Sequence, residues 1–242
     1  LQLSVPDMDK SVITDESKIV GIDVGLEKFL TGSDGTVIAN PRIGKKYEKK
    51  LRIAQRKLSR AKRGSNRRKK TKSELRRIHQ KIVNIRKNFL HQMSRKLVNE
   101  YDVLVFEDLA IKNMVKNHCL AKSIHDVSWG DFMEKVFYKA EGAGKIFLKV
   151  NARYTSQTCS VCGNREKKLL SERVHDCKKC GTVLDRDLNA SINIKNAGVV
   201  QLTEQQLISD FITKITSRRV VNAGEEVFPK TSMIHTFTQN TQ

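Results

Sequence analysis

The hydrophobic residues of this chain follow two different repeats, and each repeat predicts one kind of secondary structure. Short, nearly continuous apolar runs predict β-strands that are buried on both faces. The first run, at residues 18–24, reads Lys-Ile-Val-Gly-Ile-Asp-Val and surrounds one acidic residue, Asp23. A Ser-Asp-Gly turn signal separates the next two runs. The predicted strands are 18–24, 28–31, 36–39, 103–106 and 146–150.

Residues 45–99 instead place apolar side chains at every third or fourth position, which is the repeat of an amphipathic helix. One apolar seam spans residues 51–61 and a second spans 75–97, with Gly-Ser-Asn at 64–66 between them. Because Gly-Ser-Asn interrupts the pattern, we expect an antiparallel hairpin of two helices with the apolar seams facing inward.

The order of the elements predicts an α/β fold. A strand that carries an acid and is followed by an antiparallel meander is the start expected for an RNase H-like mixed sheet. We expect a polar loop at 110–124 and a helix at 125–143. A last helix is predicted at 185–197, with Asp185 as its N-cap and Gly198 as its stop.

The net charge of +20 is concentrated in the predicted hairpin. Residues 42–99 carry 23 Lys and Arg but only two acids, a charge of +21, whereas the rest of the chain sums to −1. The positive charges of residues 42–99 would repel one another without a polyanionic partner. This disfavours the alternative that they form only a solvated helix face. No apolar run is long enough to span a membrane, so no membrane partner is expected. The expected nucleic-acid contacts are Arg56, Lys57, Arg60, Lys62, Arg63, Arg67, Arg68, Lys69, Lys70, Lys72, Arg76, Arg77 and Arg186.

Four of the five cysteines form the pattern C-x2-C-x14-C-x2-C, at Cys159, Cys162, Cys177 and Cys180. A glycine follows each pair, and it permits a tight turn that aims backbone N–H groups at the thiolates. Four thiolates suit tetrahedral Zn²⁺ with every position filled, so we predict a structural zinc site. A pair of redox dithiols is the alternative.

Three acidic residues lie in segments with their own structural signals, and together they would form a divalent-metal site. Asp23 lies in the first strand, Glu107 ends a later strand, and Asp187 opens the last predicted helix. Carboxylate oxygens suit Mg²⁺ or Mn²⁺, and two such ions could activate water and stabilise the leaving oxygen in phosphodiester hydrolysis. Asp185 competes with Asp187 for this role. Strand alternation points Glu107 and Asp108 to opposite faces, so only one of these two can join Asp23.

Five motifs carry a family resemblance. They are Gly-Ile-Asp-Val-Gly at 21–25, Val-Phe-Glu-Asp-Leu at 105–109, Tyr-Thr-Ser-Gln-Thr-Cys-Ser-Val-Cys-Gly at 154–163, Cys-Lys-Lys-Cys-Gly at 177–181 and Asp-Arg-Asp-Leu-Asn-Ala at 185–190. The same motifs occur in this order in TnpB (OrfB) proteins, which are transposon-encoded relatives of the type V CRISPR effectors. The chain resembles this family over residues 18–198.

The resemblance implies a RuvC-type nuclease domain with an inserted zinc ribbon, and it places Asp23, Glu107 and Asp187 in the three catalytic positions. It also implies a guide RNA as partner and a double-stranded DNA target that is cut next to a short motif. Family members carry an N-terminal part that reads this motif and grips the guide, so such a part, or a second protein chain, is a further expected partner. The implied layout is 1–17 linker or remnant of an upstream domain, 18–41 RuvC part I, 42–99 basic helical hairpin, 100–153 RuvC part II, 154–184 zinc ribbon, 185–198 RuvC part III and 199–242 C-terminal tail.

The sequence therefore predicts an RNA-guided DNA endonuclease of a transposable element, located in the cytoplasm of a prokaryotic cell at the nucleoid. Two alternatives stay open. The first is a guided DNA-binding repressor that does not cut, because its carboxylates have an unproductive geometry. The second is a guide-independent, structure-specific nuclease, which the zinc ribbon and the basic hairpin disfavour.

Overall fold

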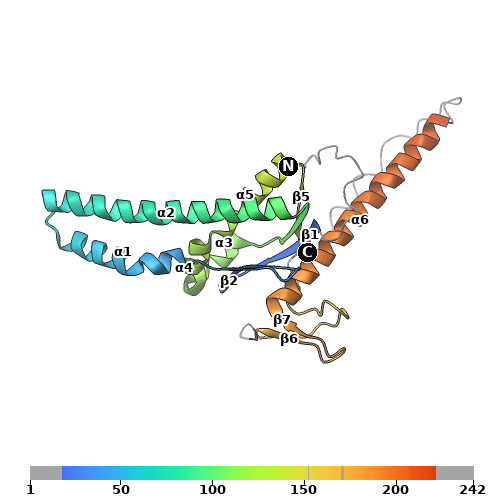
Figure 1. Ribbon diagram of the computed structural model, residues 1–242, viewed down its shortest axis with the longest axis horizontal. Coiled ribbons are helices and arrows are strands. Elements are labelled where there is room, and N and C mark those ends of the chain that lie inside the picture. Colours follow the sequence, from blue (N-terminus) through green and yellow to red (C-terminus); the bar gives the residue numbers. More distant parts are fainter. Residues whose placement is uncertain (1–17, 152, 170–171, 222–242) are drawn as a thin grey trace. The chain divides into compact units, whose positions relative to one another are not determined.

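The computed structural model describes residues 18–151, 153–169 and 172–221, and Figure 1 shows its helices and strands. Residues up to Val199 belong to one compact unit, and residues from Val200 on belong to a second. No helix among the described residues is long and apolar enough to cross a membrane. The predictions for residues 1–17 and for the end of the tail, 222–242, lie outside the described residues.

Seven strands form two sheets among the described residues. They are β1 (Ile19–Val24), β2 (Lys28–Gly32), β3 (Val37–Ala39), β4 (Val103–Glu107), β5 (Ile146–Val150), β6 (Val174–Asp176) and β7 (Val183–Asp185). The larger sheet has the order β3-β2-β1-β4-β5, and β6 pairs with β7 in the smaller one. β1, β2 and β3 form an antiparallel meander, whereas β1, β4 and β5 run parallel. The predicted α/β class with a mixed sheet is therefore confirmed.

Helices α1 (Ile43–Arg60) and α2 (Asn66–Glu100) form the predicted antiparallel hairpin and run side by side in Figure 1. Gly64 turns the chain with a φ of 82°, which favours glycine. Ser65 then caps α2, because its hydroxyl accepts the Arg68 N–H at 3.2 Å. The Gly-Ser-Asn segment thus ends one helix and starts the next, as the sequence predicts.

The polar loop predicted at 110–124 is wrong. This stretch contains the helices α3 (Ile111–Met114) and α4 (His118–Val127). α4 buries Ile124 and Val127 in the core, so tertiary packing stabilises a helix that the polar composition does not predict.

The helix predicted at 125–143 begins later than expected, as α5 (Trp129–Gly142). Ser128 separates it from α4, because this residue takes a left-handed backbone conformation with a φ of 56°. A non-glycine residue rarely adopts such a conformation, and the sequence gives no signal of it.

One face of the larger sheet packs on α2 and α5. Alternate residues of β1 and β4, including Ile22 and Phe106, join the two helices in a single buried core. Phe29 of β2 makes edge-to-face contacts with Phe89 of α2 and Phe132 of α5, at ring-centroid separations of 4.9 and 4.8 Å. These contacts fix the inner half of the hairpin to the sheet.

The opposite face of the sheet packs on α6 (Arg186–Val221), and glycines stand at two of the contact points. A methyl group on Gly21 of β1 would lie 2.8 Å from the Lys195 Cα of α6. One on Gly198 of α6 would lie 2.5 Å from a methyl carbon of Val105 in β4. The predicted helix stop at Gly198 is wrong for this reason: the glycine permits close helix–sheet packing, and the helix continues.

We expect Gly21→Ala to lower the free energy of unfolding by about 1–3 kcal/mol, because the added methyl group would press on the backbone of α6. Gly142→Ala is the matched control, since a methyl group at the end of α5 would meet nothing within 4 Å. It should be neutral or stabilise by up to about 1 kcal/mol. Urea denaturation measures both changes, and equal stability of the two variants would contradict the proposed role of Gly21.

Candidate active site and metal centre

Two of the predicted carboxylates are neighbours at the carboxyl ends of parallel strands. Ile22 of β1 pairs with Phe106 of β4. The next residues, Asp23 and Glu107, therefore lie side by side and point away from the core that contains their predecessors. Glu107 is only 8% exposed, whereas the side chain of Asp108 is 69% exposed. Glu107, and not Asp108, is therefore the acid that lies beside Asp23.

The first turn of α6 brings the third carboxylate. Asp185 is the N-cap, as predicted, and its Oδ1 accepts the Asp187 N–H at 3.0 Å. One turn further along the helix, Ser191 lies against Gly21, two residues before Asp23. The close contact between α6 and β1 therefore carries Asp187 to the carboxyl end of β1.

The pKa of Asp23 reflects how close the three carboxylates are. Burial raises this pKa well above its ordinary value, and the charges of Glu107 and Asp187 raise it further. Burial also raises the pKa of Glu107, although a hydrogen bond from the Thr155 hydroxyl lowers it. A cation bound among these groups would relieve the repulsion that opposes their ionisation.

Two side-chain cations oppose the same repulsion. Lys28 of β2 places its Nζ 3.6 Å from the Asp187 carboxylate, and Arg186 places its Nε 4.0 Å from it. Burial dominates the pKa of Asp23, but both cations lower it. Arg186 also donates from Nη1 to the Glu172 carbonyl at 3.1 Å. This position favours a role for Arg186 in balancing the carboxylates over the predicted contact with nucleic acid.

Two buried or half-buried asparagines of α6 hold the segment that precedes the first cysteine. Asn189 is fully buried and donates to the Thr158 carbonyl at 2.8 Å. Asn193, one turn further, donates to the carbonyls of Thr155 and Thr158 at 2.8 and 2.7 Å. Thr155 in turn donates its hydroxyl to Glu107. This chain of hydrogen bonds connects the cysteine-rich segment to the carboxylates.

The four predicted cysteines come together. In the part of the chain that the structure describes, they are the one set whose ligand atoms all lie within 4.8 Å of one another. The Sγ atoms of Cys159 and Cys180 are 3.7 Å apart. Those of Cys162 and Cys177 are 3.5 Å apart. Because zinc–sulfur bonds of about 2.3 Å place tetrahedral sulfurs about 3.8 Å apart, these thiolates can hold a zinc ion.

Two equivalent turns present the cysteines. Gly163 and Gly181 have φ of 70° and 73°, and each donates its N–H to the carbonyl of the first cysteine of its pair. Hydrogen bonds from Thr182 lower the pKa of the Cys180 thiol to about 6. The thiolate, which is the form that binds a metal, is therefore favoured at Cys180, whereas burial and hydrogen bonds with the other three cysteines raise the pKa of Cys162 to about 12.

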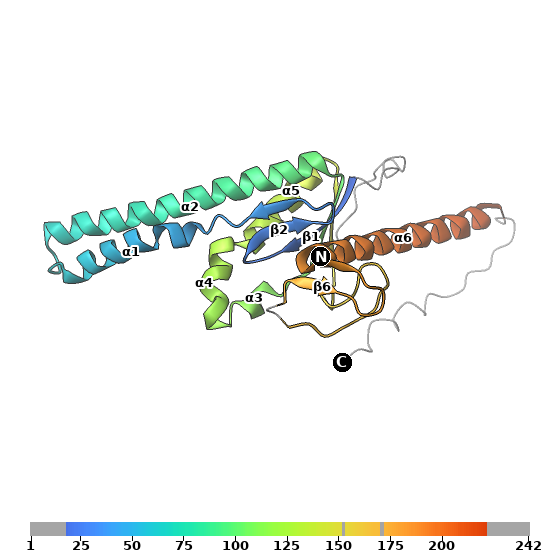
Figure 2. The ribbon, with the colours of Figure 1, turned by 60° about the horizontal axis from the view of Figure 1, so that its bottom comes forward.

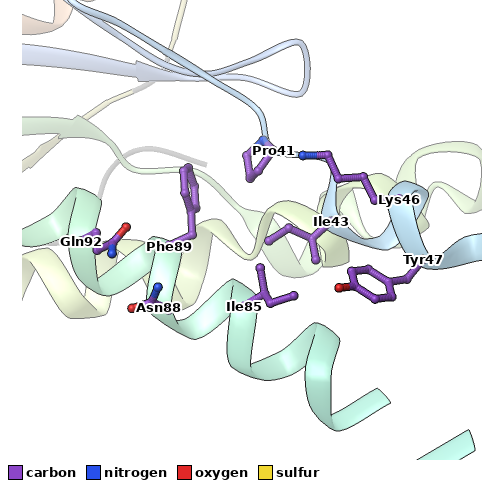
Figure 3. Close-up of a pocket in the computed structure, with 8 residues that line it drawn as sticks. All are labelled: Pro41, Ile43, Lys46, Tyr47, Ile85, Asn88, Phe89 and Gln92. Atoms are coloured by element: carbon purple, nitrogen blue, oxygen red, sulfur yellow. The ribbon is translucent and has the colours of Figure 1, made fainter. Parts of the chain in front are cut away.

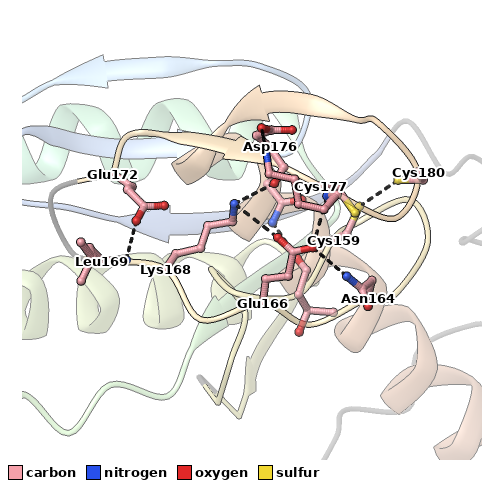
Figure 4. Close-up of polar contacts among 12 residues, drawn as sticks. Cys159, Asn164, Glu166, Lys168, Leu169, Glu172, Asp176, Cys177 and Cys180 are labelled. Atoms are coloured by element: carbon pink, nitrogen blue, oxygen red, sulfur yellow. Dashed lines mark hydrogen bonds and ion pairs between the residues drawn. The ribbon is translucent and has the colours of Figure 1, made fainter.

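Polar contacts join the two turns to each other (Figure 4). Glu166 accepts hydrogen bonds from the Asn164 side chain at 2.9 Å and from the Lys178 N–H at 3.2 Å. Lys168 donates to the Asp176 carbonyl at 2.9 Å. With so small a hydrophobic core, the module depends on these contacts and on the cysteine site for its shape.

The basic hairpin is anchored at both ends. At its base, where Figure 2 shows α4 beside α1, the Asp126 carboxylate accepts the Gly44 N–H at 2.8 Å and pairs with Arg86 at 2.8 Å. At its tip, Arg68 donates to the Leu58 carbonyl at 2.8 Å. Arg68 therefore has a structural partner, while the other predicted nucleic-acid contacts of the hairpin are exposed.

The structure brings the four predicted cysteines together and makes the three predicted carboxylates neighbours, but sequence reasoning missed the residues that position them. The three carboxylates are neighbours, but among the described residues only the cysteines bring their ligand atoms within 4.8 Å of one another. The catalytic role of the carboxylates stays a prediction. Lys28 and Thr155 were missed, because each contacts residues distant in sequence. Asn189 lies inside the Asp-Arg-Asp-Leu-Asn-Ala motif, which was the available signal.

Two family models match the chain. OrfB_IS605, described as "Probable transposase", matches residues 4–118, and "Cas12f1-like, TNB domain" matches residues 129–194. The chain is 38% identical over 182 residues to a "Putative RNA-guided DNA endonuclease" of Streptomyces pristinaespiralis, covering 74% of this chain and 45% of that protein. It is 34% identical over 198 residues to "Putative RNA-guided DNA endonuclease InsQ" of Escherichia coli K12, covering 75% and 49%.

The fold is similar to that of a solved structure, "Cryo-EM structure of the Cas12f1-sgRNA-target DNA complex", with a TM-score of 0.51 and 20% identity over 78% of this chain and 51% of that one. Together the matches define a class of transposon proteins that share their fold with Cas12f1. Within this class the chain belongs to the TnpB (OrfB) family. It spans about half the length of the curated relatives that it matches.

We expect the purified protein to hold one equivalent of a tetrahedral metal ion, and Cys180→Ser to lose it because one of four thiolates is removed. Cys119→Ser is the matched control, since this exposed cysteine lies outside the cluster. Elemental analysis and Co²⁺ substitution, which gives a thiolate charge-transfer band, measure the occupancy. Full metal content in Cys180→Ser, or its loss in Cys119→Ser, would contradict the assignment.

Proposed function

We propose that this chain is the nuclease part of an RNA-guided DNA endonuclease encoded by a transposable element, with an RNase H-like (RuvC) fold. The observation that carries the proposal is the convergence of Asp23, Glu107 and Asp187 at one edge of the sheet. The strand order β3-β2-β1-β4-β5 and the names of the relatives support it. Guide RNA and double-stranded DNA are proposed as partners of the whole protein, which acts at the nucleoid of a prokaryotic cell.

In this proposal Asp23, Glu107 and Asp187 hold Mg²⁺ or Mn²⁺, which when bound would supply a nucleophilic water and neutralise the leaving oxygen. Thr155 orients the Glu107 carboxylate through its hydroxyl. Lys28 pairs with Asp185 at 2.7 Å and lies 3.6 Å from the Asp187 carboxylate, and its positive charge is proposed to lie beside the scissile phosphate. Strand alternation exposes Asp108 and keeps it out of the proposed site.

The cysteine module, residues 154–184, is proposed to be a structural zinc ribbon. Its contribution to the site runs through the hydrogen bonds that Asn189 and Asn193 make to the segment before Cys159. The neighbouring segment, residues 185–198, is proposed to be the third part of the nuclease domain, and it lies within the first compact unit.

The basic hairpin, residues 42–99, is proposed to contact the backbone of a guide–target duplex. Its Lys and Arg side chains are dense and mostly exposed, with few acids to neutralise them. Such a surface recognises phosphates and the geometry of the duplex rather than its sequence.

Glu107→Gln should slow DNA cleavage by on the order of a thousandfold or more, since loss of a mere orienting partner of a metal ligand already costs about 10–100-fold. Asp187→Ala should behave in the same way, whereas Asp108→Asn, the exposed neighbour, should cut normally. The assay uses the protein as its gene encodes it, purified with the RNA that accompanies it, with Mg²⁺ and a duplex that matches that RNA.

Binding of the matching duplex, measured in parallel, should be nearly unchanged in the three variants. Equal loss of binding and cleavage would sink the catalytic assignment. Bound RNA without cleavage by the wild type would instead favour the guided repressor, and cleavage without any RNA would favour the structure-specific nuclease.

Neutralising the exposed cations at the tip of the hairpin should flatten the salt dependence of binding. Replacing Arg67, Lys69 and Lys70 by Gln should reduce the log–log slope by about 0.9 for each duplex phosphate contact that is lost. Arg68 is left intact because it closes the turn between the helices. A slope equal to that of the wild type would show that the tip points away from the nucleic acid.

A further inference from the structure

A groove lies where the chain leaves β3 and enters the hairpin (Figure 3). Its volume is about 390 Å³, near the lower end of the range for small-ligand pockets. Pro41 and Tyr47 line one side, and Phe89 lines the other. Phe89 also packs on the Phe29 ring at 4.9 Å, so this wall of the groove is fixed to the core.

Polar side chains complete the lining. Asn88 and Gln92 stand one turn apart on α2, and Lys46 stands on α1. Among the described residues, no hydrogen bond or ion pair of the protein engages these three side chains. Flat apolar walls beside unengaged amides and an ammonium group are the features that bind a nucleobase, through stacking and hydrogen bonds to its edge.

The charge around the groove identifies the class of ligand. The groove lies within the block that carries 23 Lys and Arg against two acids, so the local field attracts a polyanion and repels a cationic partner. The volume admits a single base but no stacked base pairs. An unpaired base that projects from a bound nucleic acid satisfies both conditions.

The position of the groove distinguishes guide from target. Phe89 packs with the core on the α2–α5 face of the sheet, whereas Asp23 and Glu107 point to the α6 face. A DNA strand that is being cut has to lie at the carboxylates, so the groove is placed for a strand that is not cut.

We infer that this groove, between the start of α1 and the middle of α2, binds one unpaired nucleobase of the guide RNA, stacked on Tyr47 and hydrogen-bonded by Asn88 and Gln92. The inference rests on the proposed binding of RNA and adds to it a site that reads a single base. Stacking at this site is independent of the phosphate contacts made by the rest of the hairpin.

To test this inference, the RNA that co-purifies with the protein is sequenced and then synthesised for binding measurements. Tyr47→Leu and the double variant Asn88→Ala/Gln92→Ala should each weaken binding of this RNA about tenfold, with an unchanged log–log salt slope, because stacking and amide hydrogen bonds release no counterions. Tyr138→Leu is the aromatic control, since Tyr138 is 44% exposed on α5 and does not line the groove. Ultraviolet crosslinking followed by mass spectrometry should place one nucleotide on Tyr47 or Phe89.

The double variant changes only exposed positions of α2, so it also controls for misfolding of Tyr47→Leu. The inference would be overturned if the double variant bound the RNA with unchanged affinity. It would also be overturned if the double variant lost affinity only for a DNA of the same sequence. A Tyr47→Leu protein that keeps its RNA affinity would overturn the inference as well. If the wild type binds no RNA, the proposed function fails and this site fails with it. If the wild type binds RNA and the variants bind equally well, only this site fails.

Discussion

The close packing of α6 on the sheet is the contact on which the rest of the structure depends. It is possible because Gly21 and Gly198 bring no side chain to the places where helix and strands meet. Three consequences follow from this one contact. Asp187 reaches the carboxyl end of β1, Asn189 reaches the segment before the first cysteine, and the α6 face of the sheet is shielded from water.

Burial of charge at this place has a cost that the surrounding residues only partly offset. The pKa of Asp23 stays well above its ordinary value despite Lys28 and Arg186. A stable fold that keeps mutually repelling acids together stores unfavourable electrostatic energy, which a bound cation would release. The hairpin avoids this cost, because its excess of cations lies on side chains that are exposed to solvent.

Separate anchors fix the two modules that flank the site. The hairpin is held by the Asp126 carboxylate of α4, which accepts a backbone N–H in the first turn of α1. The first turn of α1 has no acidic residue of its own, so Asp126 supplies the negative charge that stabilises this end of the helix. The cysteine module is held by asparagines of α6 and by the carbonyl contacts of Arg186.

The sequence by itself determined the elements whose signals are local. Apolar runs located the strands of the larger sheet, a 3-4 repeat interrupted by Gly-Ser-Asn located the hairpin, and the spacing of the cysteines identified their cluster. These predictions agree with the structure because each feature is encoded within one turn, one strand or one short loop. Strand alternation likewise predicted that only one of Glu107 and Asp108 can lie beside Asp23, and the structure buries Glu107 and exposes Asp108.

Only the tertiary structure decided the features that depend on residues distant in sequence. α4 forms because Ile124 and Val127 are buried by other elements, against its own polar composition. Gly198 looks like a helix stop in the sequence, but Val105, far away in the chain, makes it a packing residue. The partners of the carboxylates, Lys28 and Thr155, could not be predicted either, because a local pattern does not specify which charges and hydroxyl groups the folded chain brings together.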